Sequence, residues 1–137
     1  MSGLAGVLAD HIPPGVYRWH AAYHVPDVQH AVEHAGWQFA YLDGHAVECA
    51  EEFHEAVADA LSLPDTYGRT MDSLDSCLSE MCGDGKRTVL LWDAWAPLAR
   101  AEQRTFTSAV DTLRSYSSHV CVLVRGDGPD LGLDSID

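Results

Sequence analysis

Two short runs of apolar residues, at positions 88–92 and 119–124, constrain the fold of this chain more than any other feature. Each run is apolar at nearly every position, which is typical of a β-strand that is buried on both faces of a sheet. The segment between the runs carries apolar residues at helical spacing over about 101–117. Consecutive strands that are joined through a helix lie parallel, so this pattern predicts an α/β fold.

The other elements follow from periodicity and from the prolines and glycines that bound helices. Strands are predicted at 16–20 and 37–42, and helices at about 26–35, 49–62 and 71–82. The expected fold is a small parallel β-sheet packed with helices, with three core strands and an added edge strand from 16–20. We divide the chain into an N-terminal strand–helix extension at 1–36 that packs on the domain, a domain at 37–125, and an acidic flexible tail at 126–137.

Net charge excludes several classes of partner. The 137 residues include 21 acidic and 8 basic residues, which gives a formal net charge of -13. A protein that binds nucleic acid or an anionic membrane needs positive charge against the phosphates, so neither partner is expected. An acidic chain is better suited to a basic protein partner, and we expect it to be a monomer when free.

The cysteines and the N-terminus indicate a reducing compartment. Four cysteines are scattered without a CxxC pair, and the first residues lack the basic start and long apolar stretch of a secretory signal. Reduced thiols and a cytoplasmic location are therefore predicted. No cofactor is expected, because no glycine-rich phosphate loop is present.

The acidic residues are concentrated in one part of the chain. Positions 43–84 hold eleven acids and one base, Arg69, and the segment sums to -10. On the helix at 71–82, Asp72, Asp75, Ser76 and Ser79 share the face opposite the apolar stripe, beside Tyr67, which we expect to be exposed. This surface is either a solvated acidic face, a docking surface for a basic protein, or a carboxylate metal site. The last alternative lacks the DxDxDG spacing of a calcium loop.

Residues 63–78, LPDTYGRTMDSLDSCL, carry a specific resemblance. The segment resembles the signature of the barstar family, the intracellular inhibitors of small secreted ribonucleases, and the flanking strands agree with that family over about 37–124. The matching positions are Leu63, Pro64, Tyr67, Gly68, Asp72, Leu74, Cys77 and Leu78. The resemblance implies a small parallel sheet with helices. It also implies a protein that binds rather than catalyses, with the second helix and its preceding turn plugging a ribonuclease active site.

Several positions depart from the family pattern. Ser76 stands where the family has its aspartate before the cysteine, Thr70 where it has an asparagine, and Thr66 where it has an aromatic residue. Asp75 lies one residue before Ser76, and one residue is a rotation of about 100° on a helix, so Asp75 cannot simply replace that contact. The chain is then either an inhibitor retuned to another ribonuclease or toxin, or a module that binds another basic protein.

The resemblance implies a contact surface on the second helix and its turn. Tyr67 is expected to pack into the partner's cleft, and Asp72 and Asp75 to pair with its arginines or lysines. The full set of candidate contact residues is Thr66, Tyr67, Gly68, Arg69, Thr70, Asp72, Asp75, Ser76 and Ser79.

Three other groups of residues were considered as functional sites. Asp93 ends an apolar strand, where a phospho-acceptor or metal-binding aspartate can lie, but the acid pair and lysine of such a site are missing. The histidine pairs His20/His24 and His30/His34 have the spacing of zinc ligands, although surface histidines are the preferred interpretation. Asp72 and Asp75 lack a nucleophile or pocket for acid–base catalysis, so an enzyme is not expected.

Overall fold

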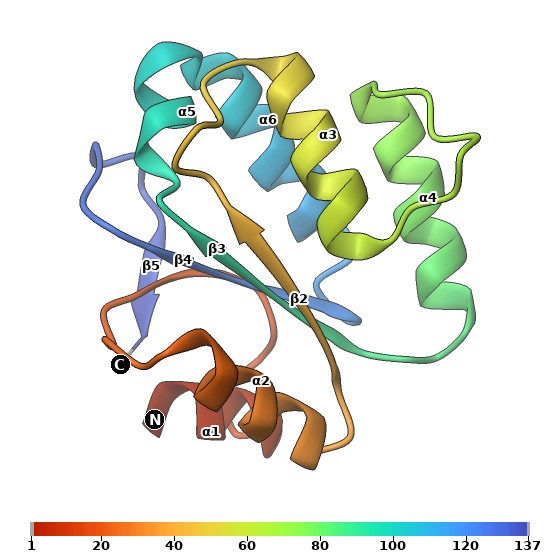
Figure 1. The fold of residues 1–137 in the computed structure, drawn as a ribbon. Coiled ribbons are helices and arrows are strands. Elements are labelled where there is room, and N and C mark those ends of the chain that lie inside the picture. The colour runs from red at the N-terminus through yellow and green to blue at the C-terminus, as the bar shows by residue number, and fades with distance from the viewer. Residues whose placement is uncertain (1, 137) are drawn as a thin grey trace.

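The computed structural model describes residues 2–136, which form one parallel sheet with helices on both faces (Figure 1). The sheet has five strands in the order β2-β3-β4-β1-β5. The strands are β1 (Val16–Trp19), β2 (Gln38–Asp43), β3 (Thr88–Asp93), β4 (Val120–Arg125) and β5 (Asp134–Ile136). The helices are α1 (Ser2–Leu8), α2 (Val25–His34), α3 (Ala50–Leu61), α4 (Met71–Gly83), α5 (Ala96–Ala101) and α6 (Gln103–Arg114). No helix within these residues is long and apolar enough to cross a membrane.

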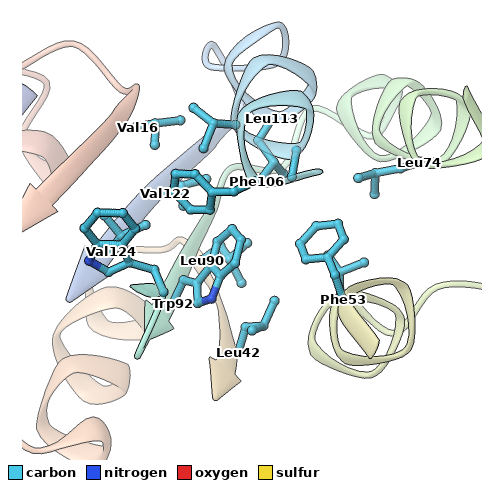
Figure 2. Close-up of a cluster of buried hydrophobic side chains, with 14 of the residues drawn as sticks. Val16, Leu42, Phe53, Leu74, Leu90, Trp92, Phe106, Leu113, Val122 and Val124 are labelled. Carbon is cyan, nitrogen blue, oxygen red and sulfur yellow. The ribbon is translucent and has the colours of Figure 1, made fainter. Parts of the chain in front are cut away.

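The larger hydrophobic core lies between the sheet and helices α3, α4, α5 and α6. Phe53 of α3 and Phe106 of α6 both point toward Trp92 of β3, and their ring centroids lie 5.4 Å from the centroid of Trp92 (Figure 2). Rings at this separation gain stabilisation beyond the area that they bury. This core fixes the helices that carry the candidate site.

A second core lies on the opposite face of the sheet, under α1 and α2. It takes alternate residues of the same strands, so that Val89 and Leu91 of β3 lie on this face while Leu90 and Trp92 lie on the other. The prediction that the runs at 88–92 and 119–124 are buried on both faces is confirmed. So is the α/β class with a parallel sheet.

The strand at 16–19 lies inside the sheet, so the expectation of an edge strand there is wrong. Val16 pairs with Val122 of β4 on one side, and Trp19 pairs with Ile136 of β5 on the other. Residues 134–136, within the expected flexible tail, form β5. Sequence patterning misses this strand because it has three residues, of which only Ile136 is apolar and packs on the second core.

Two helices also differ from the expectation. The short helix α1 precedes β1 in a segment that the sequence left unpatterned. The helix expected at about 101–117 is present as α6, and α5 is an additional short helix before it that the sequence did not predict. Pro97 lies in the first turn of α5, where proline is well placed because its missing N–H is not needed.

The end of β2 is held close to the end of β3. The Gly44 N–H donates to the Asp93 carbonyl oxygen at 2.8 Å. A Cβ at position 44 would collide with the carbonyl oxygen of Ala94 and come within 2.7 Å of Trp92 Nε1. Only glycine fits this approach, which is why the strand ends in Asp-Gly.

Candidate functional site

The candidate site is built on helix α4 and the turn before it. Leu74, Cys77 and Leu78 are buried on the core side of α4. The opposite side is exposed and carries the four polar residues that the sequence placed on one face, which we call the α4 acidic face: Asp72, Asp75, Ser76 and Ser79. The structure therefore brings these four candidates together on a rigid helix that is anchored to the core.

Hydrogen bonds tie the preceding turn to the first turn of α4. Thr70 is the N-cap, and its Oγ1 accepts a hydrogen bond from the Ser73 N–H at 3.1 Å. Ser73 Oγ in turn accepts from the Gly68 N–H at 2.7 Å. These contacts fix the backbone of residues 66–70 relative to the helix, and Thr66, Gly68, Arg69 and Thr70 are all exposed there.

Arg69 is the one base of this acidic region. Its backbone is left-handed, with φ of 55°, and its Nη1 lies 3.3 Å from Glu55 Oε1 of α3. Both side chains are more than half exposed, so this pair contributes little to stability. Arg69 can therefore leave Glu55 and pair with an acidic group of a partner at little cost in stability.

Tyr67 is buried, so the expectation of an exposed ring that packs into a partner's cleft is wrong. The side chain belongs to the larger core, and its hydroxyl shares a hydrogen bond with Nδ1 of the buried His54 on α3. Burial raises the pKa of Tyr67 to about 12. The ring holds the turn against α3, which makes Tyr67 a residue that positions the surface.

The two aspartates of the α4 acidic face differ in their surroundings. Asp75 Oδ1 accepts a hydrogen bond from the Tyr116 hydroxyl at 2.9 Å, and this contact raises the pKa of Tyr116. Among the described residues, no hydrogen bond or ion pair involves the Asp72 carboxylate. Asp72 can therefore bind a cation from outside, whereas Asp75 is partly engaged. No local pattern in the sequence predicts this contact, because Tyr116 lies 41 residues after Asp75.

Ser76 is exposed but carries no charge, unlike an aspartate at the same position. Its hydroxyl donates to the main-chain carbonyl of Asp72 at 3.2 Å, one turn back along the helix. This leaves Asp72 and Asp75 to carry the charge of the α4 acidic face.

The buried His54, which holds Tyr67 and the turn before α4, makes the stability of the fold depend on pH. Burial lowers the pKa of His54 below its ordinary value of about 6.5. In the unfolded chain His54 becomes protonated near pH 6.5, whereas in the folded chain it stays neutral to a lower pH. The free energy of unfolding is therefore not reduced by His54 above pH 6.5, and it falls as the pH drops below that value.

We therefore expect His54→Asn to flatten the dependence of unfolding free energy on pH. The gap in unfolding free energy between the parent and His54→Asn should shrink by up to about 1.4 kcal/mol per pH unit below pH 6.5. Urea unfolding at several pH values between 7.5 and 5 measures this, with the exposed His34→Gln as control. Parallel curves for parent and His54→Asn would contradict the assignment.

Asp93, considered above as a phospho-acceptor or metal ligand, is held by an arginine. Arg125 Nε donates to Asp93 Oδ1 at 2.6 Å and Nη2 donates to Oδ2 at 2.8 Å, while the Tyr41 hydroxyl donates to Oδ2 at 3.0 Å. Both carboxylate oxygens are thus already occupied. Among residues 2–136, no group of three or more His, Cys, Asp or Glu side chains is placed to hold a metal ion.

A family model described as Barstar (barnase inhibitor) matches residues 37–131. No curated protein matches the sequence. Among solved structures, the ORC2 protein of Aeropyrum pernix, in ADPNP-ADP complexes, is similar with a TM-score of 0.65 and 11% sequence identity. The match covers 93% of this chain and 40% of that one, and at this identity it shows a shared fold alone.

Proposed function

Since the chain belongs to the barstar family, we propose that it inhibits a small basic ribonuclease, or a related toxin, through the α4 acidic face and the turn at 66–70. The observation that carries this proposal is the Asp72 carboxylate, which has no partner among residues 2–136 and lies on the exposed side of a helix anchored to the core of a strongly acidic chain.

The chemistry of the partner supports this assignment. A ribonuclease must attract RNA phosphates, so its active site is lined by positive charge. Carboxylates of an inhibitor can take the places of those phosphates, and long-range attraction speeds the encounter. Asp72 and Asp75 lie one turn apart on α4 and supply two such charges from one surface.

An inhibitor of this kind needs no catalysis of its own. Barstar family members are inhibitors rather than enzymes. We place the chain in the cytoplasm, where it would act as an immunity protein without cofactor or metal and as a monomer when no partner is present.

The test is inhibition of RNA cleavage. The chain is titrated into assays of several small secreted guanyl-preferring ribonucleases, each at low and at moderate salt. We expect inhibition that is complete near one equivalent for at least one enzyme and that weakens as salt screens the charges. Failure to inhibit any of these enzymes would argue against the proposal.

A second candidate function is supported by Ser76. This residue stands at the position of the family's aspartate, and its hydroxyl is turned back onto the helix backbone. The fold would then serve as an interaction module that binds another basic protein. In that case a captured basic partner would keep its own activity, whereas a ribonuclease bound by an inhibitor stops cleaving RNA.

A further inference from the structure

The edge of the sheet formed by β2 has main-chain N–H and C=O groups that face away from β3. β2 pairs only with β3 in the described chain, and the order β2-β3-β4-β1-β5 leaves its other side at the border of the sheet. The Gln38 N–H donates to the Arg87 carbonyl and the Gly44 N–H to the Asp93 carbonyl. Because alternate residues of a parallel strand pair toward the same side, the N–H and C=O groups of Phe39, Tyr41 and Asp43 point away from the sheet.

This edge lacks the usual protection against strand addition. Natural sheets block exposed edges with lysine, proline, bulges or very short strands. β2 is six residues long, its sequence QFAYLD contains neither lysine nor proline, and its register with β3 is continuous from Gln38 to Asp43. The opposite edge, β5, is three residues long. β2 is therefore the edge that can accept another strand.

A groove runs beside the first half of β2. It has a volume of about 550 Å³, and its lining includes the first three residues of β2, 38–40, together with Glu33, Trp37, Leu61 and Met81. Trp37 is only 3% exposed, and its Nε1–H has no hydrogen-bond partner within residues 2–136. That donor is itself buried, and the Arg87 guanidinium lies 4.2 Å from the centroid of the Trp37 ring, so a chain in the groove would contact the other lining residues and not the Trp37 N–H.

The charge around the edge indicates what kind of chain fits. In Figure 1, β2 runs between α3 on one face of the sheet and α2 on the other. These two helices carry no lysine or arginine and six exposed acids, of which one, Glu55, pairs with Arg69: Asp27, Glu33, Glu51, Glu52, Glu55 and Asp59. A second copy of this chain would bring the same acids together, whereas a basic segment would complement them.

We propose that the β2 edge binds an extended segment of a basic protein as an additional strand of the sheet. Main-chain hydrogen bonds to Phe39, Tyr41 and Asp43 would supply affinity, and the acids of α2 and α3 would select basic side chains. This surface uses none of the residues of the α4 acidic face, so it does not depend on ribonuclease inhibition.

Amide hydrogen exchange tests the proposal residue by residue. The probe is an end-capped octapeptide that alternates lysine with valine, and the control peptide has the same charge with every valine replaced by proline. We expect the valine peptide to slow exchange of the Phe39, Tyr41 and Asp43 amides at least tenfold. The amides of Gln38, Ala40 and Leu42, which already face β3, should change little, and the proline peptide should protect neither set.

A pair of variants with the same charge tests whether the main-chain hydrogen bond at position 39 contributes to binding. Phe39→Pro removes an outward N–H without touching the ladder to β3, whereas Phe39→Ala removes the ring and keeps the N–H. We expect Phe39→Ala to bind the valine peptide within about threefold of the parent, and Phe39→Pro to bind it at least tenfold more weakly than Phe39→Ala. Calorimetric titration of both variants measures the difference.

Three results would overturn the proposal. One is equal affinity of the two variants for the valine peptide. Another is protection that does not alternate along β2, which needs no variant to observe. The third is a free protein that sediments as a dimer with the Phe39, Tyr41 and Asp43 amides already protected, because that would assign the edge to a second copy of the chain.

Discussion

Arg125→Met should lower the free energy of unfolding by about 3–5 kcal/mol, because it leaves Asp93 as an uncompensated and largely buried carboxylate. The side chains of Arg125 and Asp93 are only 13% and 23% exposed, and two hydrogen bonds join them. Arg125 Nη1 also donates to the carbonyl oxygens of Ala21 and Tyr23, which follow β1. The substitution therefore removes a tie between the N-terminal segment and the end of the sheet.

A double-mutant cycle in urea unfolding isolates the ion pair. Asp93→Leu/Arg125→Met removes both charges and should be less destabilised than the sum of the two single variants. Arg69→Met, which breaks the exposed pair with Glu55, is the matched control and should cost less than about 1 kcal/mol. An Arg125→Met variant as stable as Arg69→Met would show that the ion pair does not hold the fold in this way.

The N-terminal segment completes the sheet. The family match begins at residue 37, yet β1 lies between β4 and β5, and α1 and α2 supply one wall of the second core. Trp19 of β1, Val28 of α2 and Trp37 pack there against Val89 and Leu91 of β3. The division into an extension at 1–36 and a domain at 37–125 remains a prediction, but residues of both parts share one hydrophobic core.

The parts that were predictable from sequence are those with a clear period. The helical spacing of apolar residues in α4 is compatible with burial of only one side of that helix, and the continuous apolar runs of β3 and β4 only with strands buried on both faces. The parallel sheet and the α4 acidic face could therefore be predicted. β5 could not, because Asp134 and Ser135 carry no apolar signal and the strand exists only through pairing with β1. Long-range pairing of this kind leaves no local pattern in the sequence.

Side-chain contacts between elements that are distant in the sequence could not be predicted either. Tyr67 lies in a polar turn before an acidic helix. The local sequence does not predict its hydrogen bond with His54, which lies thirteen residues earlier and is buried in the core. The contact between Asp75 and Tyr116 spans 41 residues in the same way. Both contacts change the roles expected for candidate site residues, although the four residues of the α4 acidic face do lie together on one exposed side of the helix, as predicted.

The different surroundings of Asp72 and Asp75 lead to a prediction about inhibition. Asp72→Asn should weaken inhibition of the ribonuclease by about 10- to 150-fold, which corresponds to the loss of one hydrogen-bonded charge worth about 1.5–3 kcal/mol. Asp75→Asn should have a smaller effect, because the Asp75 carboxylate already accepts a hydrogen bond from Tyr116 and so gives less to a partner. Inhibition constants measured for both variants at two salt concentrations provide the comparison.

The matched control is Asp130→Asn, which removes one exposed carboxylate far along the chain, in the segment between β4 and β5. It makes the net charge less negative by the same one unit, so it measures the part of the effect that comes from long-range attraction alone. Asp72→Asn should exceed it at moderate salt, where that attraction is screened, and should unfold at the same temperature as the parent. If the Asp72 and Asp130 variants inhibit equally at both salt concentrations, the partner does not contact Asp72, and the α4 acidic face is a solvated surface.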